Sequence, residues 1–290
     1  MYPSPIDDYH RPSTIQEAVS AISNGGDEAF FIAGGQSLMQ AMKARLVQPR
    51  CLVDLQGVAE LQGVSYNGSV KIGAMTRYVV LANETGLAPA YAAIVDAAAH
   101  VGDRQVRNRG TIGGSVCWNY LAACMPAVAL GLGAKMNLMS NGGSERALSA
   151  DDFIGAPLET AREDGELLVS LELPKPPAGA GSAYKKWALL TDGLPVIGAC
   201  VYVETDGGKC TKARVAFGGL ASGPKRSEAA EGKLVGCAAG DGEAIGAAMD
   251  AAAGELETQG DLWADPAYRK HLIVTLGAEM AATAFGRAAG

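Results

Sequence analysis

Two glycine pairs constrain the fold of this chain more than any other feature. They lie in the stretches Phe31-Ile32-Ala33-Gly34-Gly35-Gln36-Ser37-Leu38 and Arg109-Gly110-Thr111-Ile112-Gly113-Gly114-Ser115. Glycine permits positive φ angles and lets another molecule approach the main chain closely. Each stretch reaches a serine suited to a helix N-cap, so we expect each turn to open a helix and to present unpaired N–H groups. Two such turns in one domain would suit the two phosphates of a dinucleotide.

Neither turn matches the established nucleotide motifs. The chain has no Gly-x-Gly-x-x-Gly fingerprint and no glycine-rich loop ending in Gly-Lys-Ser/Thr, which disfavours a nicotinamide Rossmann site and an ATPase. Catalytic side chains are scarce as well, because His10, His100 and His271 stand in unrelated segments and no nucleophile elbow or paired-carboxylate motif is present. We expect His100 to cap the end of a helix. If this protein takes part in a reaction, a bound cofactor must therefore supply the reactive group.

Composition narrows the class of protein. Of the 290 residues, 48% are hydrophobic and 19% charged, which suits a globular protein of two or three packed units. The net charge of −7 and the lack of a long Lys/Arg run argue against a nucleic-acid partner. The N-terminus lacks the basic flank and apolar core of a signal peptide, and no uncharged apolar stretch reaches the ~20 residues of a membrane span. We therefore expect a cytoplasmic protein with no membrane span.

The six cysteines are scattered along the chain. They stand at positions 51, 117, 124, 200, 210 and 237 without a Cys-x-x-Cys pair, whereas iron–sulfur and structural zinc sites need clustered thiolates. Most of them are expected to be small buried hydrophobes. We expect no metal site here, and any metal redox centre must belong to another chain.

Hydrophobic periodicity and turn residues divide the chain into three units. Residues 1–56 are expected to be β/α in character, residues 57–176 to combine strands with apolar helices, and residues 177–290 to form an antiparallel meander followed by helices. A proline- and glycine-rich break at 174–181 sets the last boundary. The expected helices span about 14–23, 38–44, 76–81, 87–99, 126–132, 240–259 and 266–285, and the expected strands about 29–33, 51–55, 61–66, 70–73, 135–139, 166–173, 182–190, 196–204 and 212–218.

Local signals refine these elements. Ser13 or Thr14 with Glu17 is expected to form a capping box, and Thr76 is expected to cap the helix that follows it. Residues 102–105 are expected to be a polar turn. The fold class is α+β.

The glycine stretches belong to a wider set of motifs. Residues 33–38, the stretch 45–49 leading to Val53-Asp54-Leu55, and residues 106–115 resemble the FAD-binding medium subunit of molybdenum hydroxylases, the family of carbon monoxide dehydrogenase and xanthine dehydrogenase. The resemblance continues through 167–174 and 184–188 to the helix start at 265–269, and so covers nearly the whole chain. It implies a vanillyl-alcohol-oxidase-like (PCMH-type) FAD-binding domain of two α/β subdomains and a small α+β C-terminal domain.

The resemblance also implies the cofactor contacts. FAD would lie extended between the domains, with residues 31–38 and 111–115 wrapping its diphosphate and ribityl chain, mostly by backbone N–H groups. In the family a cation at the position of Lys186 reaches the flavin, where it would stabilise the anionic reduced ring. The cofactor-binding candidates are Phe31, Ile32, Ala33, Gly34, Gly35, Gln36, Ser37, Leu38, Val101, Thr111, Ile112, Gly113, Gly114, Ser115, Cys124, Leu168 and Lys186. No catalytic or metal-ligating residue is expected.

Two positions depart from the family pattern. Cys124 occupies the slot of an aspartate that bonds the cofactor, and because a thiol cannot accept the same hydrogen bonds, Asn119 or Tyr120 would have to replace that contact. Leu194 stands where relatives often place an aromatic residue over the flavin, and it offers apolar cover without a stacking face.

These implications predict an electron-transfer subunit. A large molybdopterin-binding partner would hydroxylate the substrate, a small partner with [2Fe–2S] clusters would pass electrons to FAD on this chain, and an external acceptor would receive them. Two alternatives stay open. One is a stand-alone FAD-dependent oxidase or dehydrogenase, and the other is a flavin-free scaffold subunit.

Overall fold

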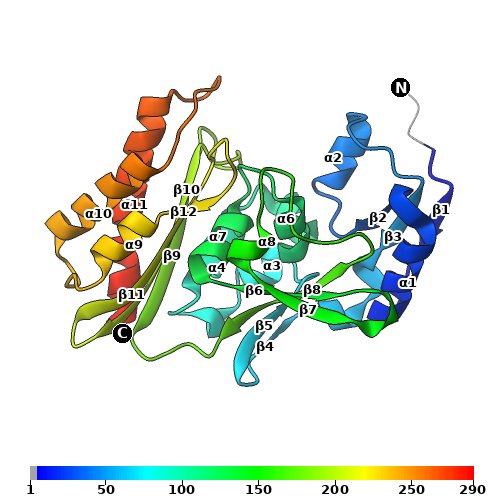
Figure 1. The fold of residues 1–290 in the computed structure, drawn as a ribbon, viewed down its shortest axis with the longest axis horizontal. Helices are drawn as coiled ribbons and strands as arrows, with labels where there is room; N and C mark the ends of the chain where they lie inside the picture. Colours follow the sequence, from blue (N-terminus) through cyan, green and yellow to red (C-terminus); the bar gives the residue numbers. More distant parts are fainter. Residues whose placement is uncertain (1–4) are drawn as a thin grey trace.

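The computed structural model describes residues 5–290, which contain three sheets in succession along the chain (Figure 1). A parallel sheet has the strand order β1-β3-β2, and two antiparallel sheets have the orders β4-β5-β8-β6-β7 and β12-β11-β10-β9. Helices pack against all three sheets, which confirms the α+β class. No helix in this part of the chain has the length and apolarity that a membrane crossing requires.

The first sheet builds the N-terminal part. Its strands are β1 (Asp8–His10), β2 (Ala29–Ile32) and β3 (Cys51–Asp54), and its helices are α1 (Ile15–Gly25) and α2 (Leu38–Lys43). The predicted capping box of α1 is confirmed, since the Thr14 hydroxyl accepts from the Glu17 amide and the Glu17 carboxylate accepts from the Thr14 amide. The apolar side of α1 packs against β3.

The second sheet carries most of the helices. Its strands are β4 (Val64–Ser65), β5 (Ser69–Gly73), β6 (Lys135–Met139), β7 (Glu145–Ser149) and β8 (Leu167–Pro174). The helices are α3 (Tyr78–Leu81), α4 (Ala92–His100), α5 (Arg104–Arg109), α6 (Ile112–Trp118), α7 (Cys124–Leu132) and α8 (Ala150–Phe153).

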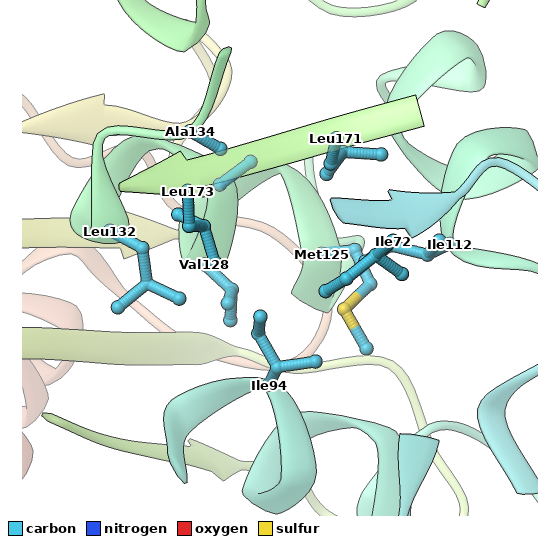
Figure 2. Close-up of a pocket in the computed structure, with 10 residues that line it drawn as sticks. Ile72, Ile94, Ile112, Met125, Val128, Leu132, Ala134, Leu171 and Leu173 are labelled. Carbon is cyan, nitrogen blue, oxygen red and sulfur yellow. The ribbon is translucent and has the colours of Figure 1, made fainter. Parts of the chain in front are cut away.

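Figure 2 shows apolar side chains of these elements converging on an interior void of about 10 Å³. Ile72 and Leu171 come from the sheet, and Ile94 and Met125 from the helices. A void of this size holds one water molecule at most and offers it no polar partner, so it belongs to the core.

The third sheet is covered on both faces. Its strands are β9 (Ala180–Trp187), β10 (Ile197–Asp206), β11 (Lys209–Gly218) and β12 (Lys225–Arg226), and its helices are α9 (Glu228–Leu234), α10 (Gly242–Glu255) and α11 (Pro266–Ala288). Helix α11 covers one face, and α4 and α7 cover the other. Strand β10 is therefore buried from Ile197 to Val203, whereas the predicted period-two pattern is typical of a half-buried strand.

Several local predictions are wrong. The Thr76 hydroxyl exchanges hydrogen bonds with the main chain of Gly63, so Arg77 is the N-cap of α3 instead. The helix expected from Leu87 begins at Ala92, and the turn expected at 102–105 runs into α5, which the Asp103 carboxylate caps. Strands β1, β7 and β12 and helices α8 and α9 have no counterpart among the expected elements. His100 ends α4 as predicted, with Nδ1 2.7 Å from the Asp96 carbonyl oxygen.

Candidate cofactor-binding cleft

A cleft of about 1170 Å³ has walls from all three parts of the chain. The N-terminal part contributes α1, β2 and the first glycine stretch, the middle part contributes α6 and the loop before β8, and the C-terminal part contributes Lys186 and the loop Asp192–Pro195. Ligand pockets for drug-sized molecules occupy about 300–1,000 Å³. The cleft therefore has room for a molecule as large as a dinucleotide.

The two glycine stretches lie against each other in this cleft. A Cβ atom on Gly34 would lie 2.0 Å from the Arg109 carbonyl oxygen and 2.9 Å from the Gly110 Cα atom. A Cβ on Gly114 would lie 3.4 Å from the Ala33 Cβ. Only a glycine at position 34 permits this approach, so two segments far apart in the sequence form one continuous wall.

The two stretches differ in the hydrogen-bond donors that they offer. The amides of Gly35, Gln36 and Ser37 donate no hydrogen bond within residues 5–290, and Gly35 has a φ of 72°, in the left-handed region. These three residues line the cleft, so their donors are available to a ligand. A ligand with anionic oxygens would satisfy them.

The amides of the second stretch are already paired. Those of Ile112 and Gly113 donate to the carbonyl oxygens of Thr76 and Ala74, and those of Gly114 and Ser115 donate to Thr111. Thr111 is the N-cap of α6, so the two glycines lie inside its first turn and the expectation of Ser115 as N-cap is wrong. Glycine is needed here for space, since a Cβ on Gly113 would lie 2.6 Å from the Ala74 Cβ.

The N-cap expectation for the first stretch holds only in part. Ser37 occupies the N-cap position of α2, but its side chain accepts no hydrogen bond from that helix. The hydroxyl is therefore not committed to the helix, and it lines the cleft.

The structure brings nearly all of the predicted site residues together. The candidates that line the cleft are Phe31, Ala33, Gly34, Gly35, Gln36, Ser37, Leu38, Val101, Thr111, Gly113, Gly114, Ser115, Cys124, Leu168 and Lys186. Ile32 and Ile112 do not line it. Ile112 lines the core void of Figure 2 instead. Ile32 is absent from the cleft wall although Phe30, Phe31 and Ala33 beside it line the cleft.

Lys186 is a half-buried cation at the end of β9. Its Nζ donates to the Gly193 carbonyl oxygen at 2.5 Å, which ties the loop after β9 back onto the strand and holds Leu194 at the cleft. Burial lowers the pKa of this ammonium group, while the nearby Asp192 carboxylate opposes that shift. The neighbouring Lys185 faces away and pairs with Glu279 at 2.7 Å.

Cys124 begins α7 in an apolar environment. Burial raises the pKa of its thiol, which lies next to the Tyr184 hydroxyl. Of the two substitutes expected for the missing aspartate, Asn119 is fully buried and does not line the cleft. Its amide nitrogen donates to the carbonyl oxygens of residues 155, 156 and 159, while its Oδ1 accepts no hydrogen bond within residues 5–290. Tyr120 lines the cleft and is 37% exposed.

Other residues of the cleft wall were missed from the sequence. They include Tyr78, Cys117, Trp118, Leu158 and Arg162. Tyr78 packs over Gly110, where a Cβ would lie 2.6 Å from the tyrosine ring. Arg162 lies in the loop before β8 and donates to the Glu166 carbonyl oxygen at 2.9 Å. Tyr78 lies in α3 and Cys117 and Trp118 lie in α6, whereas Leu158 and Arg162 belong to the loop before β8. No spacing signal in the sequence marks any of them. Within residues 5–290, no three His, Cys, Asp or Glu side chains gather as metal ligands would.

Comparisons with known proteins agree with this architecture. One family model, the FAD binding domain in molybdopterin dehydrogenase, matches residues 4–176, and another, the CO dehydrogenase flavoprotein C-terminal domain, matches residues 182–284. The chain is 37% identical over 232 residues to the carbon monoxide dehydrogenase medium chain of Afipia carboxidovorans, which covers 80% of each protein.

Two solved structures are similar over nearly the whole chain. One is a carbon monoxide dehydrogenase from Hydrogenophaga pseudoflava, with a TM-score of 0.92 and 33% identity over 99% of both chains. The other is quinoline 2-oxidoreductase from Pseudomonas putida 86, with a TM-score of 0.90 and 31% identity over 99% of both chains. The chain thus belongs to the family of FAD-binding medium subunits of molybdenum hydroxylases.

Proposed function

We propose that the cleft holds FAD in an extended form, with the diphosphate against the stretch Gly34–Ser37. The observation that carries this proposal is the row of unpaired amides at Gly35, Gln36 and Ser37, in a wall made continuous by the contact of Gly34 with Arg109. Helices α2 and α6 are short, so the donors themselves rather than a helix dipole would hold the phosphates. We also propose that the cleft-lining candidates named above are its contacts.

The remaining walls suit the rest of the cofactor. Phe31, Leu167 and Leu168 provide apolar surface, and Leu194 adds cover from the loop that Lys186 holds. The half-buried ammonium of Lys186 would favour negative charge on a flavin ring placed near it. When bound, FAD supplies two-electron chemistry with release of electrons singly or in pairs; the chain supplies binding, orientation and exclusion of water.

The family membership makes the chain a subunit of a multi-subunit molybdenum hydroxylase. We propose that electrons reach it from [2Fe–2S] clusters on a small partner, after substrate oxidation at a molybdopterin centre on a large partner, and leave to an external acceptor. Residues 1–56 and 57–176 would act as the two FAD-binding subdomains and 177–290 as the C-terminal domain. All six cysteines are free, which supports a reducing compartment such as the cytoplasm.

The visible spectrum of the purified chain tests the proposal. We expect flavin absorption bands, either as isolated or after addition of FAD and removal of the excess. Gly34→Val should abolish them, because the larger side chain would separate the two stretches. A chain without flavin bands under both conditions would refute the proposal, and a Gly34→Val variant that sustains full activity of the complex without flavin would favour a scaffold role.

A further inference from the structure

The outer wall of the cleft carries a cluster of cations. Arg77, Arg104 and Arg109 are exposed, and within residues 5–290 none of their side chains makes a hydrogen bond or an ion pair. Several arginines elsewhere in the chain pair with Asp or Glu, namely Arg146, Arg214, Arg226, Arg269 and Arg287, although the exposed Arg11 has no hydrogen bond or ion pair within residues 5–290. Three unpaired arginines are thus gathered on this part of the surface.

The backbone brings these arginines together. The Tyr78 amide donates to the Gly110 carbonyl oxygen at 3.1 Å, and Arg77 forms an isolated bridge with Thr111, so Arg77 and Arg109 lie on neighbouring segments. Arg104 begins α5, which packs against α3. We call the surface made by Arg77, Val79, Val80, Arg104 and Arg109 the α3–α5 face.

The charge of this face is opposite to that of the chain. Segments 77–81 and 104–109 contain arginines and no carboxylate, although the whole chain has a net charge of −7. Val79 and Val80 add apolar surface, being 38% and 46% exposed. Interfaces between proteins commonly combine an apolar centre with arginine, and complementary charge directs the encounter.

The same two helices form the inside of the cleft. Tyr78 of α3 and Val106 of α5 line it, while Val79, Val80, Arg104 and Arg109 point outward. The face is therefore the outer surface of a thin part of the cleft wall. A donor of electrons must dock close to the acceptor, because electron tunnelling weakens steeply with distance.

We propose that the α3–α5 face docks an acidic surface of the iron–sulfur partner. This inference rests on the proposed function, since it names where that partner binds relative to the cleft. Binding would pair the three arginines with carboxylates and cover the two valines.

The experiment uses the full chain and the iron–sulfur chain of its own complex, separated and mixed again. Affinity is measured at low and high salt for the wild type and for the triple variant Arg77→Glu/Arg104→Glu/Arg109→Glu, with flavin content recorded for each. We expect affinity to fall steeply with salt in the wild type, and the variant to bind at least about tenfold more weakly at low salt with its flavin retained.

The matched control reverses three exposed lysines in the C-terminal part that have no ion pair within residues 5–290: Lys209→Glu/Lys233→Glu/Lys270→Glu. This variant carries the same change in net charge and should bind like the wild type. If the triple arginine variant loses its flavin, the single variant Arg104→Glu decides by the same criteria, because Arg109 contacts Gly34 through its main chain and Arg77 bridges Thr111, whereas Arg104 lies at the far end of α5.

Three results would overturn the inference. They are salt-independent binding by the wild type, undiminished binding by a flavin-loaded arginine variant, and equal weakening by the lysine control. If the proposed function itself is wrong, the result is a different one: the wild-type chain would lack flavin, whether or not it binds the iron–sulfur chain.

Discussion

Replacement of Gly34 by alanine tests whether the two glycine stretches must touch. The added Cβ would lie 2.0 Å from the Arg109 carbonyl oxygen and 2.7 Å from its carbonyl carbon. Carbon atoms pack best at about 3.5–4.0 Å, so the two stretches would have to separate by roughly 1.5 Å. Main-chain atoms stand on both sides of the contact, and neither can turn away as a flexible side chain would.

The expected effect has two parts. Overpacking of this kind costs about 1–3 kcal/mol in the free energy of unfolding. The same separation moves the amides of Gly35 and Gln36 away from the rest of the cleft wall, and a loss of about 1.4–2.8 kcal/mol in binding corresponds to a ten- to hundredfold weaker affinity for FAD. The variant should therefore be less stable without FAD and should also bind FAD less tightly.

Urea unfolding of the FAD-free chain and a flavin-fluorescence titration measure these parts separately. The matched control is Gly246→Ala in α10, where an added Cβ meets no atom within 4 Å; it should gain about 0.5–1 kcal/mol in stability and leave FAD binding unchanged. If Gly34→Ala unfolds with the same free energy as the wild type, the close contact between Gly34 and Arg109 is refuted. Reduced stability with unchanged FAD affinity would refute the placement of the diphosphate at these turns.

Other parts of the site make separate predictions. Lys186→Met should lower the flavin midpoint potential by roughly 20–60 mV in a dye-equilibration titration, while Lys185→Met, which removes only the exposed pair with Glu279, should not shift it. Cys124→Ala should change FAD affinity by less than about threefold, because a thiol is a weak hydrogen-bonding group; a tenfold loss would show a direct contact. The hydrogen bond from Arg146 holds the pKa of Glu166 below its usual 4.5. The pair therefore contributes its full stability to the folded chain above pH 4.5, and this contribution is lost as the pH falls through the lower pKa of the folded state. The difference in urea midpoint between the wild type and Glu166→Gln should accordingly shrink between about pH 5 and pH 2, and a constant difference would contradict the pairing.

The sequence predicted the elements that have a period or a cap. The capping box at Thr14 and Glu17, the strands β9, β10 and β11 and the long C-terminal helices all carry such signals, and the structure has them. For strand β10, the sequence predicted the strand but not the burial of both of its faces. Period two indicates which positions share a face, but burial of both faces depends on α4, α7 and α11, which come from distant parts of the chain.

Much of the cleft could be found from motifs, and the rest depends on loops. The glycine stretches, Leu168 and Lys186 carry family motifs, and apart from Ile32 and Ile112 the candidate residues in them line the cleft. Arg162 and Leu158 lie in a segment without periodicity, and their place follows from tertiary contacts such as the bond from the Leu158 amide to the Asn119 carbonyl oxygen. The pattern of residues along the sequence does not predict that contact.

The glycines themselves show why a motif identifies a site more readily than it explains one. Both pairs suggest phosphate-binding turns, yet only the first leaves its amides unpaired, and the amides of Gly113 and Gly114 are used by Ala74 and Thr111. The second pair is required because Ala74 packs against it, and Gly34 because Arg109 does. One stretch thus provides donors and the other provides the space that lets the donors face a shared cleft. Substitution in either should weaken binding of the same ligand, although for different physical reasons.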